Sequence, residues 1–95
     1  MFVHIFGFRW KPAATDALKA QAQEEILAFR NVIPGLREVH AGTNVSERAR
    51  GYELAGLMLF ESRKEFEAYT THPAHLALLR WLVPLIEPVE LDFEA

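Results

Sequence analysis

Two stretches of this chain, residues 1–10 and 52–61, place apolar side chains on both sides of an extended strand. In the first, Phe2, His4, Phe6, Phe8 and Trp10 alternate with Val3 and Ile5; in the second, Leu54, Gly56, Met58 and Phe60 alternate with Ala55, Leu57 and Leu59. Successive side chains of a strand point to opposite faces, so both faces of these strands need cover. The sequence therefore predicts a sheet that cannot leave either face in water.

Helix and turn signals follow the first strand. Thr15 is a suitable N-cap for a helix running to about Asn31, because apolar residues recur at helical spacing behind it. Pro34 and Gly35 then predict a turn. A second strand is expected over residues 36–42, followed by a polar loop over residues 43–51.

Ser62 and Glu65 have the spacing of a capping box, which predicts a helix ending near residues 69–70. Pro73 favours a new helix through residue 82, and residues 89–93 alternate as a last strand. The resulting order is strand, helix, strand, strand, helix, strand. It predicts an α+β, ferredoxin-like βαββαβ fold with a four-stranded antiparallel sheet and its helices on one face.

The face without helices would carry Val3, Ile5, Ala55, Leu57, Leu59, Val89, Leu91 and Phe93. So continuous an apolar surface is too large for a stable monomer. The same face of a second copy, related by a two-fold axis, is the simplest cover. A homodimer through the sheet face is expected.

Composition narrows the function. The 95 residues make one domain, 1–95, and the formal net charge of −3 with scattered basic residues argues against nucleic acid as a partner. The chain has no cysteine, which excludes disulfides and thiol chemistry, and its histidines lack metal-site spacing, so no metal is expected. The start lacks signal-peptide features and the apolar runs are too short to cross a membrane, so a cytoplasmic protein without membrane contact is the default expectation.

The segment from Tyr69 to His75 is the candidate site. It places one phenol and two imidazoles around a predicted break between helices. His72 precedes a proline, so it is interpreted as a cap or turn residue. Tyr69 and His75 can point into one space, either as an acid–base pair or as side chains that only satisfy backbone groups.

Several motifs together resemble the stress-responsive A/B barrel family: His4-Ile-Phe, Ile33-Pro-Gly, Phe60-Glu-Ser, Tyr69-xx-His-Pro-Ala-His75 and Asp92-Phe93. The resemblance covers nearly the whole chain and implies a dimeric α+β barrel. The family includes stress-induced proteins without assigned activity and a polyketide cyclase. In the cyclase, the residues matching Tyr69 and His75 are the catalytic pair, and the one matching His4 lines the pocket. This chain departs from the cyclase on the first helix, where Ala22 and Ile26 replace aromatic residues.

These observations lead to a hypothesis. A small molecule would bind between sheet and helices, in a pocket walled by His4, Phe6, Phe8, Gly56, Met58, Phe66 and Leu78. His75 would act as general base and Tyr69 as hydrogen-bond donor in proton transfer on a carbonyl or polyketide-like substrate, a lyase or isomerase type of reaction without a cofactor. The alternatives are a non-enzymatic stress-associated dimer and, by fold analogy alone, a cofactor-free monooxygenase.

Overall fold

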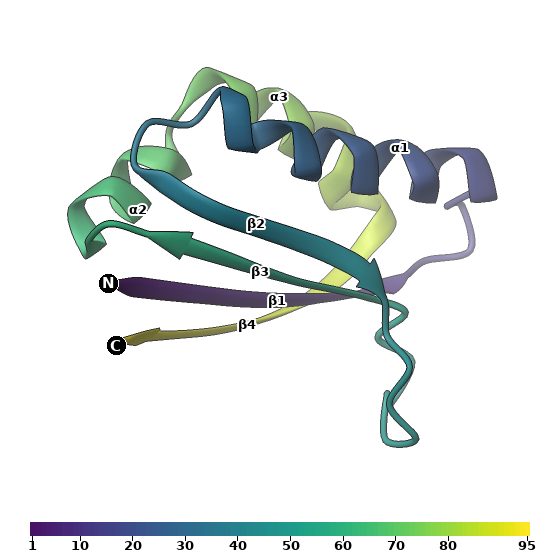
Figure 1. The fold of residues 1–95 in the computed structure, drawn as a ribbon. Coiled ribbons are helices and arrows are strands. Elements are labelled where there is room, and N and C mark those ends of the chain that lie inside the picture. Colours follow the sequence, from purple (N-terminus) through teal and green to yellow (C-terminus); the bar gives the residue numbers. More distant parts are fainter.

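A four-stranded antiparallel sheet carries all of the helices on one face (Figure 1). The computed structural model describes the whole chain, residues 1–95. Its strands are β1 (Phe2–Trp10), β2 (Leu36–Thr43), β3 (Leu54–Phe60) and β4 (Ile86–Glu94), and its helices are α1 (Asp16–Ala28), α2 (Arg63–Thr70) and α3 (Pro73–Leu82). Two short 3-10 helices, η1 (Phe29–Asn31) and η2 (Val83–Leu85), follow α1 and α3. The strand order β2-β3-β1-β4 confirms the predicted ferredoxin-like fold.

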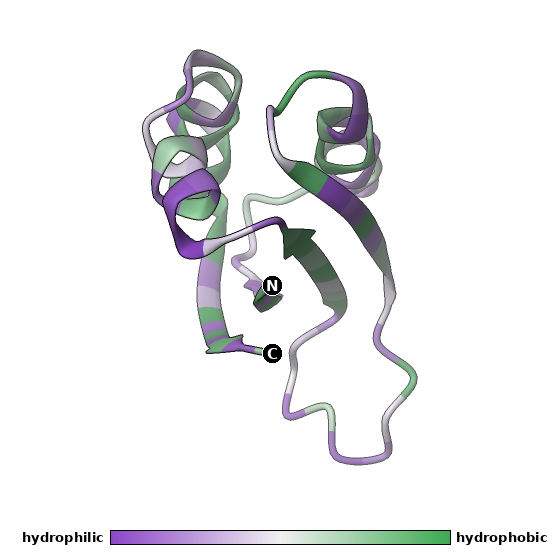
Figure 2. Cartoon of the chain, turned by 60° about the vertical axis from the view of Figure 1, so that its left-hand side comes forward, coloured by the Kyte–Doolittle hydropathy of each residue, from purple (hydrophilic) through white to green (hydrophobic).

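The main core lies between the helices and the inner face of the sheet. β1 pairs with β3 on one side and β4 on the other, and the register sets Phe6 opposite both Gly56 and Glu90. Phe60, Met58 and Leu82 are the largest fully buried side chains. Figure 2 shows β3 as a hydrophobic strand, in agreement with the apolar residues predicted for both of its faces. This packing fixes which strand residues face the helices.

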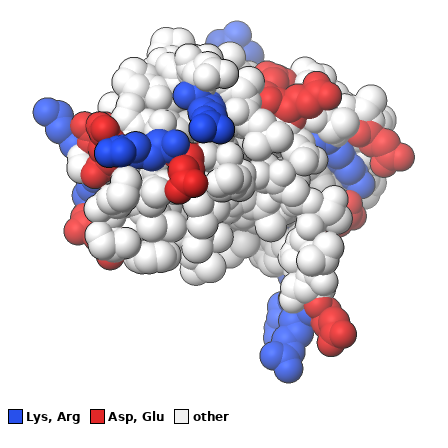
Figure 3. Space-filling view, in the orientation of Figure 1, with Lys and Arg blue, Asp and Glu red and all other residues white.

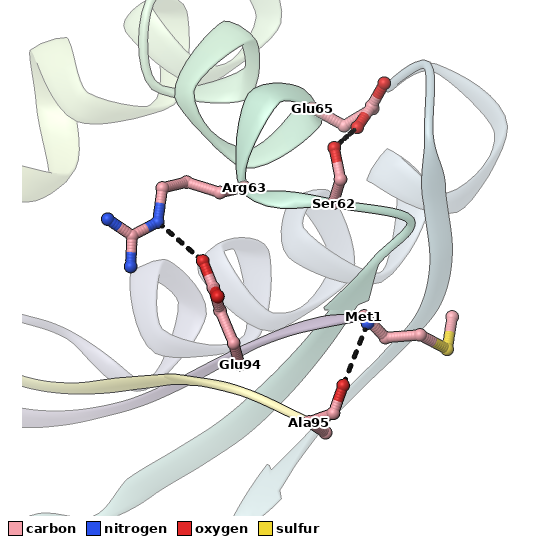
Figure 4. Close-up of polar contacts among 6 residues, drawn as sticks. All are labelled: Met1, Ser62, Arg63, Glu65, Glu94 and Ala95. Atoms are coloured by element: carbon pink, nitrogen blue, oxygen red, sulfur yellow. Dashed lines mark hydrogen bonds and ion pairs between the residues drawn. The ribbon is translucent and has the colours of Figure 1, made fainter.

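Helix starts agree with the sequence signals, with one correction. The Thr15 hydroxyl accepts a hydrogen bond from the Leu18 N–H at 3.2 Å, and α1 begins immediately after it. The predicted capping box of Ser62 and Glu65 is wrong. The two side chains bond to each other (Figure 4) and Ser62 makes no side-chain cap bond. Glu65 lies against Gly35, in the space that a Cβ at this position would take, and that packing holds its carboxylate beside the Ser62 hydroxyl instead of over the backbone.

The last strand is longer than predicted. It starts at Ile86 rather than at residue 89 and includes Pro88. β4 is an edge strand that pairs only with β1, and an edge strand tolerates the missing N–H of proline. Pro88 therefore does not mark the start of β4, contrary to the prediction.

The two chain ends hold β4 against β1 along its full length. The Met1 amine donates to the Ala95 carbonyl at 3.1 Å (Figure 4). The Ala95 N–H in turn donates to the Met1 carbonyl at 2.8 Å. Arg63 at the start of α2 pairs with Glu94 at 2.9 Å. These contacts add to the β1–β4 pairing, whose register puts Glu90 and Asp92 opposite Phe6 and His4 on the inner face of the sheet.

The outer face of the sheet has no helix over it (Figure 1). On β4, Val89, Leu91 and Phe93 are 37, 61 and 50 % exposed. In the view of Figure 3, charged groups of both signs are scattered, and they also mark the loop that projects below the sheet. No helix of the structure is both long enough and apolar enough to span a bilayer.

Candidate active site

A cavity of about 100 Å³ lies between the inner face of the sheet and the helices α1 and α3. The predicted site residues that line it are His4, Phe6, Phe8, Met58, Tyr69, His75 and Leu78. Further lining comes from Ile26, Leu79, Leu82, Val83, Ile86, Pro88 and Glu90. The wall is mostly apolar, and the phenol, the two imidazoles and one carboxylate are its ionisable groups. Such a cavity, with a few convergent polar groups, is typical of a small-molecule site.

Tyr69 lies in the last turn of α2 and is only 5 % exposed. Its ring packs against Phe60 at 5.3 Å and against Phe29 at 5.9 Å between centroids. The Tyr69 hydroxyl has no hydrogen-bond partner in the protein and is not fully buried, so it is accessible. Tyr69 lines this cavity and also a second hollow beside Ile33 and His72. Burial, followed by the negative charge of Glu90, raises the pKa of Tyr69 well above its usual value. The phenol is therefore a hydrogen-bond donor at neutral pH.

His75 lies in the first turn of α3. The N-cap of this helix is His72, whose ring Nδ1 accepts from the Ala74 N–H at 3.1 Å, so the structural role predicted for His72 is confirmed. His75 Nδ1 lies 3.1 Å from the Thr70 carbonyl oxygen. A carbonyl only accepts, so Nδ1 carries the proton and, in the neutral ring, Nε2 keeps its lone pair.

The environment of His75 favours that neutral ring. Burial is the main reason that its pKa is lowered, and the nearby His4 adds to the effect, while the Thr70 carbonyl and Glu90 oppose it. The Tyr69 and His75 rings lie 4.2 Å apart between centroids at 33°. A potential base and a potential donor thus meet at one wall of the cavity.

His4 projects from β1 toward the same space, 6.4 Å from the Tyr69 ring between centroids. Its Nδ1 lies 2.5 Å from Oδ1 of Asp92 on the neighbouring strand β4. That contact orients the ring and leaves Nε2 on the other side. Sequence reasoning placed neither Asp92 nor Glu90 in the site. The alternation of residues 89–93 contained the signal, because both carboxylates fall on the side opposite Val89, Leu91 and Phe93.

Two predicted wall residues, Gly56 and Phe66, do not line this cavity. The ring of Phe6 occupies the space beside Gly56 where a Cβ would otherwise stand, so Phe6 forms the wall there. Phe66 stacks on Phe2 at 4.6 Å between centroids and lies 5.0 Å from His4, behind the cavity wall. Both positions are neighbours of the cavity lining.

Comparison with known proteins agrees with this fold. Olivetolic acid cyclase from Cannabis sativa is 28 % identical over 75 residues, which are 77 % of this chain and 74 % of the cyclase. A dimeric ferredoxin-like protein of unknown function from Thermobifida fusca superposes with a TM-score of 0.85 at 26 % identity, covering 99 % of this chain and 90 % of that one. Hydroxynitrile lyase from Passiflora edulis has a TM-score of 0.86 at 23 % identity, over 97 % of this chain and 90 % of the lyase. The likeness to the lyase concerns the fold.

The family model described as the stress responsive A/B barrel domain matches residues 2–95, nearly the full length. Its extent agrees with the single sheet and single core described above. The chain belongs to the stress responsive A/B barrel domain family.

Proposed function

We propose that this chain is a homodimeric enzyme that transfers a proton on a small carbonyl or polyketide-like compound, without a cofactor. The substrate binds in the cavity between sheet and helices. His75 Nε2 removes a proton from the carbon next to the carbonyl. The Tyr69 hydroxyl donates a hydrogen bond to the oxygen on which negative charge develops. The enolate then attacks a second carbonyl carbon of the substrate, which closes a ring and puts negative charge on that carbonyl oxygen, or it is reprotonated at another carbon, which gives an isomer. In both cases the His75 imidazolium returns its proton to the product.

One observation carries this proposal: the Tyr69 hydroxyl is unpaired beside the ring of His75, and both line one apolar cavity. A buried phenol used only for packing normally bonds to the protein. A donor left free at a cavity is instead available to a ligand. The low dielectric of the surrounding apolar wall strengthens such a hydrogen bond.

The names of similar proteins support the reaction class. One relative is a cyclase and one structural neighbour is a lyase, and neither name implies a redox reaction. Solved neighbours from Thermobifida fusca and Bacteroides fragilis are described as dimeric. In this chain a dimer would cover the outer sheet face, where Leu91 and Phe93 are otherwise half or more exposed.

A second candidate is a non-enzymatic dimer in which the pair only ties α2 to α3. The hydrogen bond from His75 to the Thr70 carbonyl favours it, because it bridges that helix junction. The free hydroxyl of Tyr69 does not serve such a role. The two candidates differ in what they predict for a ligand and for turnover.

Exchange of carbon-bound hydrogen tests the proposal without knowledge of the natural substrate. Butanone in deuterated buffer is incubated with the protein, and loss of its α-proton signals is followed by NMR. A positioned base accelerates proton transfer by roughly 10²–10⁴-fold. We expect protein-dependent exchange in the parent, its near loss in His75→Ala, and a smaller decrease in Tyr69→Phe.

The variant His72→Ala is the matched control, since it removes an imidazole three residues away that caps a helix. Exchange should persist in this variant at temperatures where it remains folded. Equal exchange rates in the parent and in His75→Ala would rule out His75 as the base. A ligand that binds without any exchange would support a binding protein over an enzyme.

A further inference from the structure

Glu90 is the one group with a full charge in the wall of the cavity, because Asp, Lys and Arg are all missing from its lining. It projects from β4 on the same side as Asp92, and the register sets it opposite Phe6 on β1. Its inward neighbour Asp92 contacts His4, and Glu94 pairs with Arg63. Glu90 has no such partner in the chain.

No lysine or arginine in the wall offsets that charge. Burial lowers the pKa of His75 and so favours its neutral ring, and the Nδ1 of His4 is already bound to the carboxylate of Asp92. The charge of Glu90 is felt at the reacting groups, since it raises the pKa of Tyr69 and acts in the same direction on the pKa of His75. Apolar walls screen such a field less than water does.

We propose that Glu90 sets the charge selectivity of the cavity, which takes an uncharged or cationic ligand and excludes carboxylic acids. The inference rests on the proposed function and narrows its substrate class. A carboxylate in the cavity would lie near the Glu90 carboxylate, with no lysine or arginine in the wall to compensate. Glu90 is itself exposed, so water weakens the repulsion between the two like charges and the resulting preference is modest. A neutral carbonyl compound meets no such penalty, and an ammonium or amidinium group would be attracted.

The size of the cavity limits the part of the ligand that it encloses. An apolar cavity of about 150 Å³ accepts benzene. The volume of about 100 Å³ here therefore suits a compact branched alkyl or carbonyl group. Any larger portion of the ligand would extend through the opening of the cavity.

Three isosteric probes of that size separate charge from shape: isobutyrate, isobutyramide and isobutyramidine. Their affinities are measured at pH 7 by amide chemical-shift titration of the isotope-labelled full chain. In the parent, the amide and the amidine should bind about threefold to tenfold more tightly than the carboxylate, as expected for one partly exposed charge pair. Glu90→Gln should bring the three affinities to within about twofold of one another by removing that charge.

Glu24→Gln on the exposed side of α1 is the control, because it changes the net charge equally without touching the cavity. It should leave the parent order of affinities intact. Carboxylate binding as tight as amide binding in the parent would overturn the inference, and so would an affinity gap that survives Glu90→Gln. In either case, protein-dependent exchange of butanone, if it is observed, would still support the proposed function. If none of the probes binds and butanone does not exchange, the proposed function fails and the inference fails with it.

Discussion

His4 and Asp92 lie directly opposite each other on β1 and β4, with Nδ1 and Oδ1 2.5 Å apart. The contact joins residues 88 positions apart in the chain. His4 is buried and Asp92 is partly exposed, so a carboxylate near the rim orients an imidazole inside the cavity. Asp92 is therefore a positioning residue for the proposed site.

Asp92→Asn tests this role. The amide keeps the shape but loses the charge-assisted hydrogen bond, so the free energy of unfolding should fall by about 1–2 kcal/mol. Urea denaturation provides the measurement, and the NMR signals of the His4 ring should report a change in tautomer. Glu94→Gln is the control, because its exposed pairing with Arg63 should contribute less than about 1 kcal/mol. A loss of stability in Asp92→Asn no larger than in Glu94→Gln would show that the contact is not stabilising.

The two histidines of the helix junction should behave differently. His72→Ala removes an N-cap and should cost about 1 kcal/mol of unfolding free energy. His75→Ala should leave most of the stability and remove proton exchange. Thermal unfolding and butanone exchange, measured on both variants, give the comparison. Equal losses of stability with no effect on exchange or binding would make the segment a structural clasp.

The pH dependence of exchange should follow His75. The base must be neutral, and burial lowers its pKa from the ordinary 6.5, so activity should rise with pH and reach half its plateau below pH 6.5. The pKa of Tyr69 is raised, so the phenol should impose no loss of activity up to pH 10. Initial exchange rates between pH 4.5 and 10 give the profile. A midpoint above pH 6.5 would contradict the assignment of His75.

The same lowered pKa has a consequence for stability. Below pH 6.5 the unfolded chain binds a proton on His75 that the folded chain does not yet bind. The His75 contribution to the unfolding free energy should therefore decrease as pH falls from 6.5 to the folded pKa, and then level off. The difference between the parent and His75→Ala, taken from urea denaturation at several pH values, isolates this contribution.

Gly56→Ala should narrow the cavity through Phe6. A Cβ at residue 56 would stand inside the Phe6 ring, so the ring must shift, and Phe6 is part of the cavity wall. Overpacking of this kind costs about 1–3 kcal/mol. We expect lower stability in denaturation and weaker binding of isobutyramide by NMR titration. Gly42→Ala is the control, because a Cβ there meets no atom within 4 Å. Unchanged binding in Gly56→Ala would place the ligand elsewhere.

Leu57→Glu should disrupt the proposed dimer. Leu57 lies on the outer face of β3, opposite Ile5 on β1 and His40 on β2. A carboxylate buried there against a second copy would cost several kcal/mol. Light scattering should show a dimer for the parent and a monomer or aggregate for the variant. Leu76→Glu makes the same kind of change on α3, on the helical side of the sheet, at a residue that is 47 % exposed, and it should remain dimeric. A stable Leu57→Glu dimer would place the interface on another surface.

Local sequence preferences determine the central strands and the helix break of this protein. The two-sided apolar pattern of residues 2–8 and 54–60 predicts two central strands, and these strands are the neighbours β1 and β3. A proline after His72 restricts that residue and starts α3, so the helix break and the positions of Tyr69 and His75 follow from short-range rules. These features could be predicted from the spacing of apolar residues, from helix capping and from the steric restrictions of proline.

The composition of the cavity wall depended on long-range packing. Gly56 marks a close approach in the sequence, but only the β1–β3 register shows that the Phe6 ring fills the space. The pairing of His4 with Asp92 and the inward position of Glu90 depend on the β1–β4 register, which the chain ends help to fix. Register joins residues far apart in the chain, and no local preference encodes which of them meet. The strand residues that face the helices could therefore be predicted from alternation, whereas their partners across the sheet and the charge at the cavity emerged only in the folded chain.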